Sequence, residues 1–151
     1  MQDSKEIVPV ITIVKPIVSI PEALSSWKSY EELKMSIKTS TDIQLIQGKE
    51  FLKKSFWRKM SKFFGLSLEL KSENNIKQED NSHTWYAVYR AYARTGDFMD
   101  GDGACNTHEK GRILTTHDAR ATAHTRAKNR AISDLVGGGE VSAEEVINDS
   151  H

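Results

Sequence analysis

Apolar residues spaced three or four positions apart predict two helices in the first half of the chain. They cover residues 24–37 and 55–64, and we expect the second to end at Gly65, because glycine adopts the left-handed backbone of a helix C-terminus without strain. Two short apolar runs flank Gly48 between these helices and predict a hairpin within residues 39–54.

Strict alternation of apolar and polar residues predicts strands in the middle of the chain. Three leucines alternate with polar residues over 66–71, and a longer alternation covers 85–94. The segment 72–83 between them is almost entirely polar and is expected to be a loop. One face of the second strand is rich in alanine, which lets a helix approach closely, so we expect these side chains to point inward: Trp85, Ala87, Tyr89, Ala91 and Ala93.

A hairpin and a long helix complete the pattern. The Thr-Gly-Asp sequence at 95–97 predicts a tight turn, followed by a strand that runs to about residue 109. The longest helical periodicity covers residues 117–136 and is followed by three glycines at 137–139. A last short helix is expected from Ser142, because the pattern Ser-x-x-Glu forms a capping box.

These elements predict one α+β domain with an antiparallel β-β-β-α core and a short helix before it. We expect a flexible arm over residues 1–21, where two prolines interrupt an apolar run. The domain itself is expected over 22–139, and a short acidic helix or tail over 140–151. A chain of 151 residues is long enough for one core of this size and too short for two.

Charge is segregated along the chain although the total is neutral, with 21 Lys and Arg against 21 Asp and Glu. Residues 49–71 hold seven cations and two acids, a local charge of +5. Residues 112–130 hold five cations and one acid, a local charge of +4, whereas residues 131–151 hold five acids and no Lys or Arg. Basic regions beside an acidic end are typical of an anion-binding face.

The composition indicates a soluble protein of the cell interior. The single cysteine, Cys105, cannot form an internal disulfide, which favours a reducing compartment such as the cytoplasm. The apolar stretch over residues 7–20 is too short to span a bilayer and contains Lys15 and two prolines. It also lacks the cationic start and the cleavage site of a secretory signal. We therefore expect no membrane partner.

Three groups of residues are candidates for nucleic-acid contact. Two of them recur at helical spacing within or next to the helices at 55–64 and 117–136. The third interleaves a tyrosine with arginines on one face of the strand at 85–94, as in surfaces that stack bases and pair with phosphates. The candidates are Lys54, Arg58 and Lys62; Arg126, Arg130 and Ser133; and Arg90, Tyr92 and Arg94. Each group also fits an ordinary solvated face.

Metal-binding and catalytic patterns are weaker. Cys105 and the histidines at 108, 117 and 124 would supply four zinc ligands, but they lack the paired spacing of a structural zinc site. Glu109 and the aspartates of the sequence GDFMDGDG are candidates for a magnesium site in a nuclease. The chain has no phosphate-binding loop, nucleophile elbow or dinucleotide fingerprint. We expect no metal, no cofactor and no enzymatic activity.

Three segments within residues 43–137 share a pattern with a known family: KKSFWRKMSKFFGLSLEL, WYAVYRAYARTGDFMDGDGACNTHEKGR and TTHDARATAHTRAKNRAISDLVG. They resemble the core of single-strand annealing proteins of the Rad fifty-two superfamily, in particular small phage and archaeal members. The matching positions are Gly96, Gly101, Gly103 and Glu109 in the strand-turn-strand part, and Ala121, Ala123, Thr125, Asn129, Arg130, Ala131, Ile132 and Gly137 in the helix.

The resemblance implies single-stranded DNA held in a basic groove by a homo-oligomer that forms rings or filaments. Family cations that contact DNA are matched here by Arg130, by Asn129 in place of a lysine, and by Ser133 in place of an arginine. Arg126 lies one turn before Arg130 and is expected to replace a missing charge. The expected function is non-enzymatic binding and annealing of single-stranded DNA in recombination, repair or replication. A structural adaptor that assembles through its chain ends, and a metal-dependent nuclease, are the alternatives.

Overall fold

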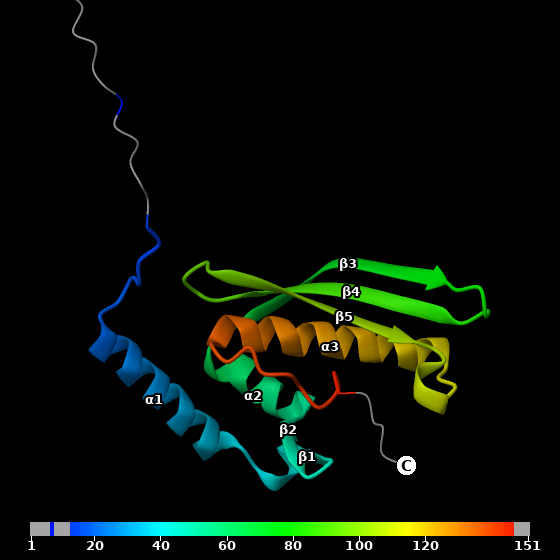
Figure 1. Ribbon diagram of the computed structural model, residues 1–151, viewed down its shortest axis with the longest axis horizontal. Coiled ribbons are helices and arrows are strands. Elements are labelled where there is room, and N and C mark those ends of the chain that lie inside the picture. Colours follow the sequence, from blue (N-terminus) through cyan, green and yellow to red (C-terminus); the bar gives the residue numbers. More distant parts are fainter. Residues whose placement is uncertain (1–6, 8–12, 147–151) are drawn as a thin grey trace, which may run out of the picture.

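The computed structural model describes residue 7 and residues 13–146, which form a mixed α+β arrangement (Figure 1). Two 3-10 turns, Ser40–Asp42 and Glu109–Gly111, accompany the regular elements. The α+β class predicted from the sequence is confirmed, because three strands form one antiparallel sheet and helices pack with it. The elements are α1 (Ile20–Ile37), β1 (Ile43–Ile46), β2 (Lys49–Leu52), α2 (Lys54–Phe63), β3 (Ser67–Lys77), β4 (His83–Tyr92), β5 (Phe98–Asn106) and α3 (Thr116–Val136).

The strands of the sheet lie in the order β3-β4-β5, and the helix α3 lies against one face of this sheet (Figure 1). Its contact side consists of four alanines one turn apart that have no exposed surface: Ala119, Ala123, Ala127 and Ala131. On β5, a Cβ at Gly101 would overlap the backbone nitrogen of Ala131, and a Cβ at Gly103 would overlap the carbonyl oxygen of Ala123. Glycine on the strand and alanine on the helix therefore bring the two backbones into direct contact.

The strand β4 presents its alanine-rich face to α3, as predicted. Ala87, Tyr89 and Ala91 are buried, whereas Trp85 is half-buried and Ala93 lies beyond the end of the strand at Tyr92. The hairpin to β5 turns at Gly96, whose φ of 92° favours glycine. The predicted hairpin around Gly48 is also present, with β1 and β2 antiparallel.

A second core lies on the other side of α3, where α2 packs (Figure 1). Phe56, Trp57 and Met60 of α2 have no exposed surface. They form one cluster with residues of the neighbouring elements, including Tyr30 of α1 and Ile132 of α3. The helix α3 is thus the middle layer between the sheet and α2, and the opposite side of α2 faces solvent.

The predicted loop over residues 72–83 is too long, because β3 continues to Lys77 and β4 begins at His83, which leaves residues 78–82 as the connection. This part of β3 pairs with β4 from Ser72 opposite Val88 to Lys77 opposite His83. The strand lies at the edge of the sheet, so most of its polar side chains stay in water while the backbone makes the ladder hydrogen bonds. Hydrophobic alternation therefore does not reveal it. The strand β5 in turn ends at Asn106, before the predicted residue 109.

Two predictions at the chain ends also change. The helix α1 begins at Ile20, within the predicted arm over residues 1–21, because Ser19 and Glu22 form a capping box. The predicted helix from Ser142 is a turn in which Glu145 accepts hydrogen bonds from the backbone and hydroxyl of Ser142. The remaining parts of these two predictions, residues 1–6, 8–12 and 147–151, lie outside the described residues.

Candidate nucleic-acid interface

The predicted cations of α2 lie on its solvent side. Lys54, Arg58 and Lys62 recur at every fourth residue and are exposed, and we refer to them as the α2 row. They lie opposite the buried residues of the second core, because α2 is strongly amphipathic. Lys59, on the flank of the helix, instead forms an ion pair with the buried Asp42 at 2.5 Å. The α2 row is therefore the part of this basic region that faces water.

The α2 row and α3 together line a groove of about 280 Å³, hereafter the anion groove. Its lining contains four cationic side chains and no acidic one. Among the described residues, none of these four cations forms an ion pair. The groove is lined by Lys54, Arg58, Ser61 and Lys62 of α2, Leu68 of β3, and Thr125, Lys128, Asn129 and Ile132 of α3.

Lys128 is the groove cation that the sequence reasoning missed. Its ammonium lies 5.0 Å from the centre of the Tyr89 ring, within the range of a cation–π contact. The four-residue spacing of Arg126 and Arg130 does not include Lys128, which lies between them in the sequence. The alanine that recurs every four residues indicates which face of this helix is buried. This face has Lys128 on one flank and Arg126 on the other, so the alanine repeat is the sequence feature that separates the two cations.

Two aromatic side chains lie next to the end of the α2 row. Phe63 and Phe64 directly follow Lys62 and are 64% and 39% exposed. The helix ends at Phe63, and neither ring belongs to the buried cluster that contains Phe56, Trp57 and Met60. An exposed ring beside a cation is a suitable surface for stacking a nucleobase.

Arg126 is buried on the opposite flank of α3. Its guanidinium donates to both carboxylate oxygens of Glu109 at 2.6 and 2.9 Å, to the carbonyl oxygen of Ala104 at 2.7 Å and to that of Glu144 at 2.5 Å. Burial alone would lower the pKa of Arg126, but the hydrogen bonds and charge of Glu109 outweigh burial and raise it. The guanidinium is therefore charged and uses four of its five N–H donors within the chain, so little of it is left for a phosphate.

The other two predicted residues of α3 also have partners within the chain. Arg130 forms ion pairs with Asp102 at 2.9 Å and with Glu145 at 2.8 Å. Ser133 is buried and donates its hydroxyl hydrogen bond to the carbonyl oxygen of Glu140. That Arg126, Arg130 and Ser133 contact DNA stays a prediction, and the structure places all three outside the lining of the anion groove.

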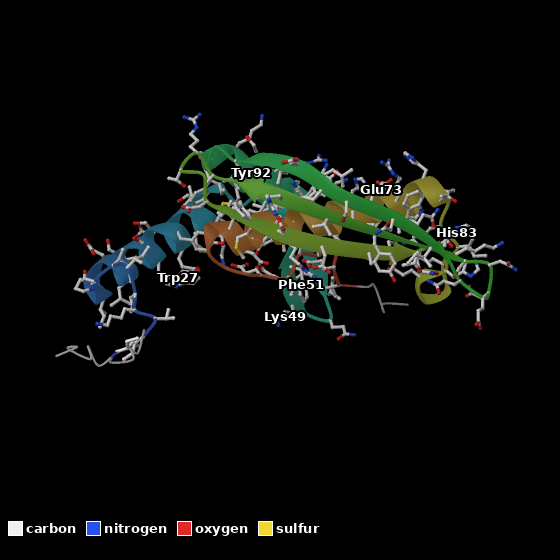
Figure 2. The ribbon with its side chains drawn as sticks, turned by 90° about the horizontal axis from the view of Figure 1, so that it is seen from above. Trp27, Lys49, Phe51, Glu73, His83 and Tyr92 are labelled. Atoms are coloured by element: carbon white, nitrogen blue, oxygen red, sulfur yellow. The ribbon has the colours of Figure 1, made fainter. Side chains whose placement is uncertain are left out.

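Arg90 and Tyr92 of the third predicted group lie on the outer face of the sheet, which no described helix covers (Figure 2). Arg90 donates to both oxygens of Asp100 at 2.7 and 3.0 Å. The Tyr92 hydroxyl donates to Glu69 at 2.9 Å, and Arg94 is exposed beyond the end of β4. Acidic partners thus accompany Arg90 and Tyr92, so this face attracts a phosphate less than the anion groove does.

A hydrogen-bonded chain that the sequence did not suggest joins β3, β4 and α3. The Tyr89 hydroxyl lies 2.7 Å from Nδ1 of His124, whose Nε2 contacts Glu73, and Arg120 donates to both oxygens of Glu73. Figure 2 shows Glu73 on β3 beside α3. Hydrogen bonding from Arg120 lowers the pKa of Glu73, and burial raises the pKa of Tyr89. The network fixes Tyr89 and thereby the ring beneath Lys128.

The residues considered for metal binding are placed apart or already bonded. Cys105 is buried, and burial raises the pKa of its thiol to about 11. Both oxygens of Glu109 accept hydrogen bonds from Arg126, and Asp100 pairs with Arg90. The part of the chain that the structure describes contains no group of three or more His, Cys, Asp or Glu side chains arranged to hold a metal ion.

No family model matches this chain, and no curated protein matches it. Within residues 13–146, no helix combines the length and the apolar character that crossing a membrane requires. The family resemblance therefore stays a prediction from the sequence, and the geometry of the anion groove is the structural observation that bears on function.

Proposed function

We propose that this protein binds single-stranded DNA in the anion groove and promotes the pairing of complementary strands without an enzymatic step. The observation that carries the proposal is the composition of the groove, in which four cations from two helices converge and no acid is present. Solvated charged faces usually mix both signs, whereas a hollow lined by one sign concentrates an oppositely charged ligand. The sequence resemblance to annealing proteins supports the same function.

The length of the α2 row suits several consecutive phosphates. A helix rises about 1.5 Å per residue, so the eight residue-to-residue steps from Lys54 to Lys62 span about 12 Å. Stacked nucleotides advance about 3.4 Å each along one strand, so the row spans about three or four of them. Lys128 faces the row from α3, with Thr125 and Asn129 as hydrogen-bonding neighbours. The phosphates would lie between the two helices.

The exposed rings of Phe63 and Phe64 favour a single strand over a duplex. Unpaired bases can stack on these rings, whereas the bases of a duplex are already stacked on each other. Neutralised phosphates and accessible base edges would let a second strand test different registers until base pairs form. Because one groove holds only a few nucleotides, annealing of longer strands requires several copies, and self-association in the cell interior is part of the proposal.

The proposal is tested by annealing two complementary dye-labelled oligonucleotides, followed by fluorescence energy transfer without nucleotide or metal. We expect the wild type to accelerate annealing and the double variant Arg58→Gln/Lys62→Gln to lose most of the acceleration. The matched control is Lys28→Gln/Lys77→Gln, which removes the same charge at two exposed positions outside the groove. With four phosphate contacts, log affinity should fall against log salt with a slope of about −2.8. No acceleration by the wild type, or equal loss in both variants, overturns the proposal.

A structural adaptor is the second candidate, favoured by the uncovered outer face of the sheet. Ile76, Tyr86 and Phe98 lie on this face and are 49%, 42% and 49% exposed. Such exposed apolar side chains are typical of a surface that binds another protein. The adaptor function predicts that wild type binds oligonucleotides no better than it binds dextran sulfate at the same charge concentration.

A further inference from the structure

The segment over residues 140–146, hereafter the C-terminal segment, runs alongside α3 (Figure 1). It has no helix or strand of its own. The Ala143 amide donates to the carbonyl oxygen of Leu52 at 2.8 Å, and Ser133 donates to that of Glu140 at 3.0 Å. These contacts hold the segment between β2 and α3, where it forms one wall of a second hollow of about 470 Å³.

The acids of the C-terminal segment bond the donors that border the anion groove. The carboxylate of Glu144 accepts from the backbone amide of Lys54 at 2.8 Å and from the side-chain amide of Asn129 at 3.1 Å. Glu145 accepts from Arg130 at 2.8 Å. Lys54 and Asn129 both line the anion groove, so the carboxylate of Glu144 lies at its border and competes there with any phosphate.

The helix N-terminus beneath Glu144 has no acid of its own. The first turn of α2 contains no acidic residue, and its N-cap, Lys53, makes no side-chain capping bond. Glu144 supplies the negative group that such a helix end favours. A phosphate is also negatively charged and accepts hydrogen bonds from the same donors, so it can take the place of the Glu144 carboxylate.

We propose that the C-terminal segment is a built-in competitor for DNA, and that single-stranded DNA displaces it to reach Arg130, Asn129 and the N-terminus of α2. The inference rests on the proposed function of the anion groove and extends the binding surface along α3. In the ion pair between Arg130 and Glu145, the Arg130 side chain is 44% exposed, so a phosphate can approach it from solvent. The Glu145 side chain is only 6% exposed and also accepts hydrogen bonds from Ser142, so it leaves Arg130 only when the segment moves as a whole. Arg126 keeps its bonds to Glu109 and Ala104 and stays outside the contact.

The test compares Glu144→Gln/Glu145→Gln with a matched control, Glu32→Gln/Glu79→Gln, which removes two exposed acids far from α3 in the sequence. Binding of a labelled oligothymidine is measured by fluorescence anisotropy between 0.05 and 0.3 M salt. One added phosphate contact at 0.1 M salt strengthens binding about fivefold and steepens the log–log salt slope by about 0.7. We expect at least this gain for Glu144→Gln/Glu145→Gln and a smaller gain, with no change of slope, for the control.

Hydrogen exchange on the wild type gives a second readout that does not depend on the stability of a variant. Saturating oligothymidine should speed exchange at the Ala143 amide, because its bond to Leu52 breaks when the segment leaves. Two results overturn the proposal that the C-terminal segment competes with DNA: unchanged protection of the Ala143 amide in the complex, or binding by Glu144→Gln/Glu145→Gln that is no tighter than binding by its control. Neither result contradicts DNA binding in the anion groove. Failure of the wild type and of both variants to bind oligothymidine overturns the proposed function and the competitor together.

Discussion

Replacing Arg126 with methionine distinguishes a structural cation from a DNA-binding one. Arg126 is 8% exposed, and its guanidinium donates to Glu109, Ala104 and Glu144. Methionine fills most of the same volume, but it leaves the Glu109 carboxylate without its ionic partner and two backbone carbonyls without a donor. The change therefore removes an ion pair while disturbing the packing little.

The expected loss of stability is large for a single substitution. Removing one partner of a buried ion pair costs about 3–5 kcal/mol. Because the Glu109 side chain is 19% exposed and regains some hydration, we expect about 3 kcal/mol. In a protein of this size each kcal/mol corresponds to about 2–4 °C in Tm, so the midpoint should fall by about 6–12 °C.

Urea unfolding and thermal melts measure this loss, and the double variant Arg126→Met/Glu109→Leu should recover most of it, since an apolar pair replaces the ionic pair. Below its midpoint, Arg126→Met should bind oligothymidine at least as tightly as the wild type does, because the change also removes the bond to the Glu144 carbonyl oxygen that helps hold the C-terminal segment. Arg58→Gln should bind it more weakly. A stability within about 0.5 kcal/mol of wild type combined with weaker DNA binding would refute the reasoning, because it would make Arg126 a DNA contact rather than a structural cation.

Three further predictions follow from the packing and the titrating groups. Gly103→Ala should cost about 1–3 kcal/mol in urea unfolding, because its Cβ would overlap the backbone of α3. Burial alone would raise the pKa of Asp42, but hydrogen bonds, first from Lys59, hold it well below its usual range. Its charge therefore stabilises the fold above about pH 4, and this stability is lost at lower pH, so Asp42→Asn should lose less stability than wild type between pH 6 and pH 3 in chemical denaturation. Cys105 is buried with a thiol pKa of about 11, so maleimide should label it slowly at neutral pH and rapidly in denaturant.

Local patterns were sufficient for most elements of the fold. The spacing of apolar residues placed α2 and α3 to within a residue or two at their starts. Alternation identified β4 and its inward face, and glycines marked the turns at Gly48 and Gly96. The α2 row was also predictable, because a helix of known phase fixes which side carries Lys54, Arg58 and Lys62. Each of these features depends on residues close in the sequence.

The location of the binding surface depended on contacts between distant residues. Small side chains create little hydrophobic periodicity, so the pattern does not distinguish Ala119 and Ala123 from surface positions, although both are buried against the sheet. The structure showed that Lys128 faces α2 and that Arg126 is paired with Glu109, 17 residues away. Whether a cation is free depends on which acids the fold brings to it.

The sequence by itself determined the α+β class, the order of most elements and the solvent-facing cations of α2, because hydrophobic period and turn chemistry act locally. Only the tertiary structure decided the extent of β3, the groove between α2 and α3, and the placement of the acidic C-terminal segment. An edge strand is held by backbone bonds to its neighbour, and an ion pair by the meeting of two surfaces. Neither the edge strand nor the ion pair produces a periodic pattern in the sequence. Which charged side chains stay accessible is therefore decided by how the elements of this protein pack together.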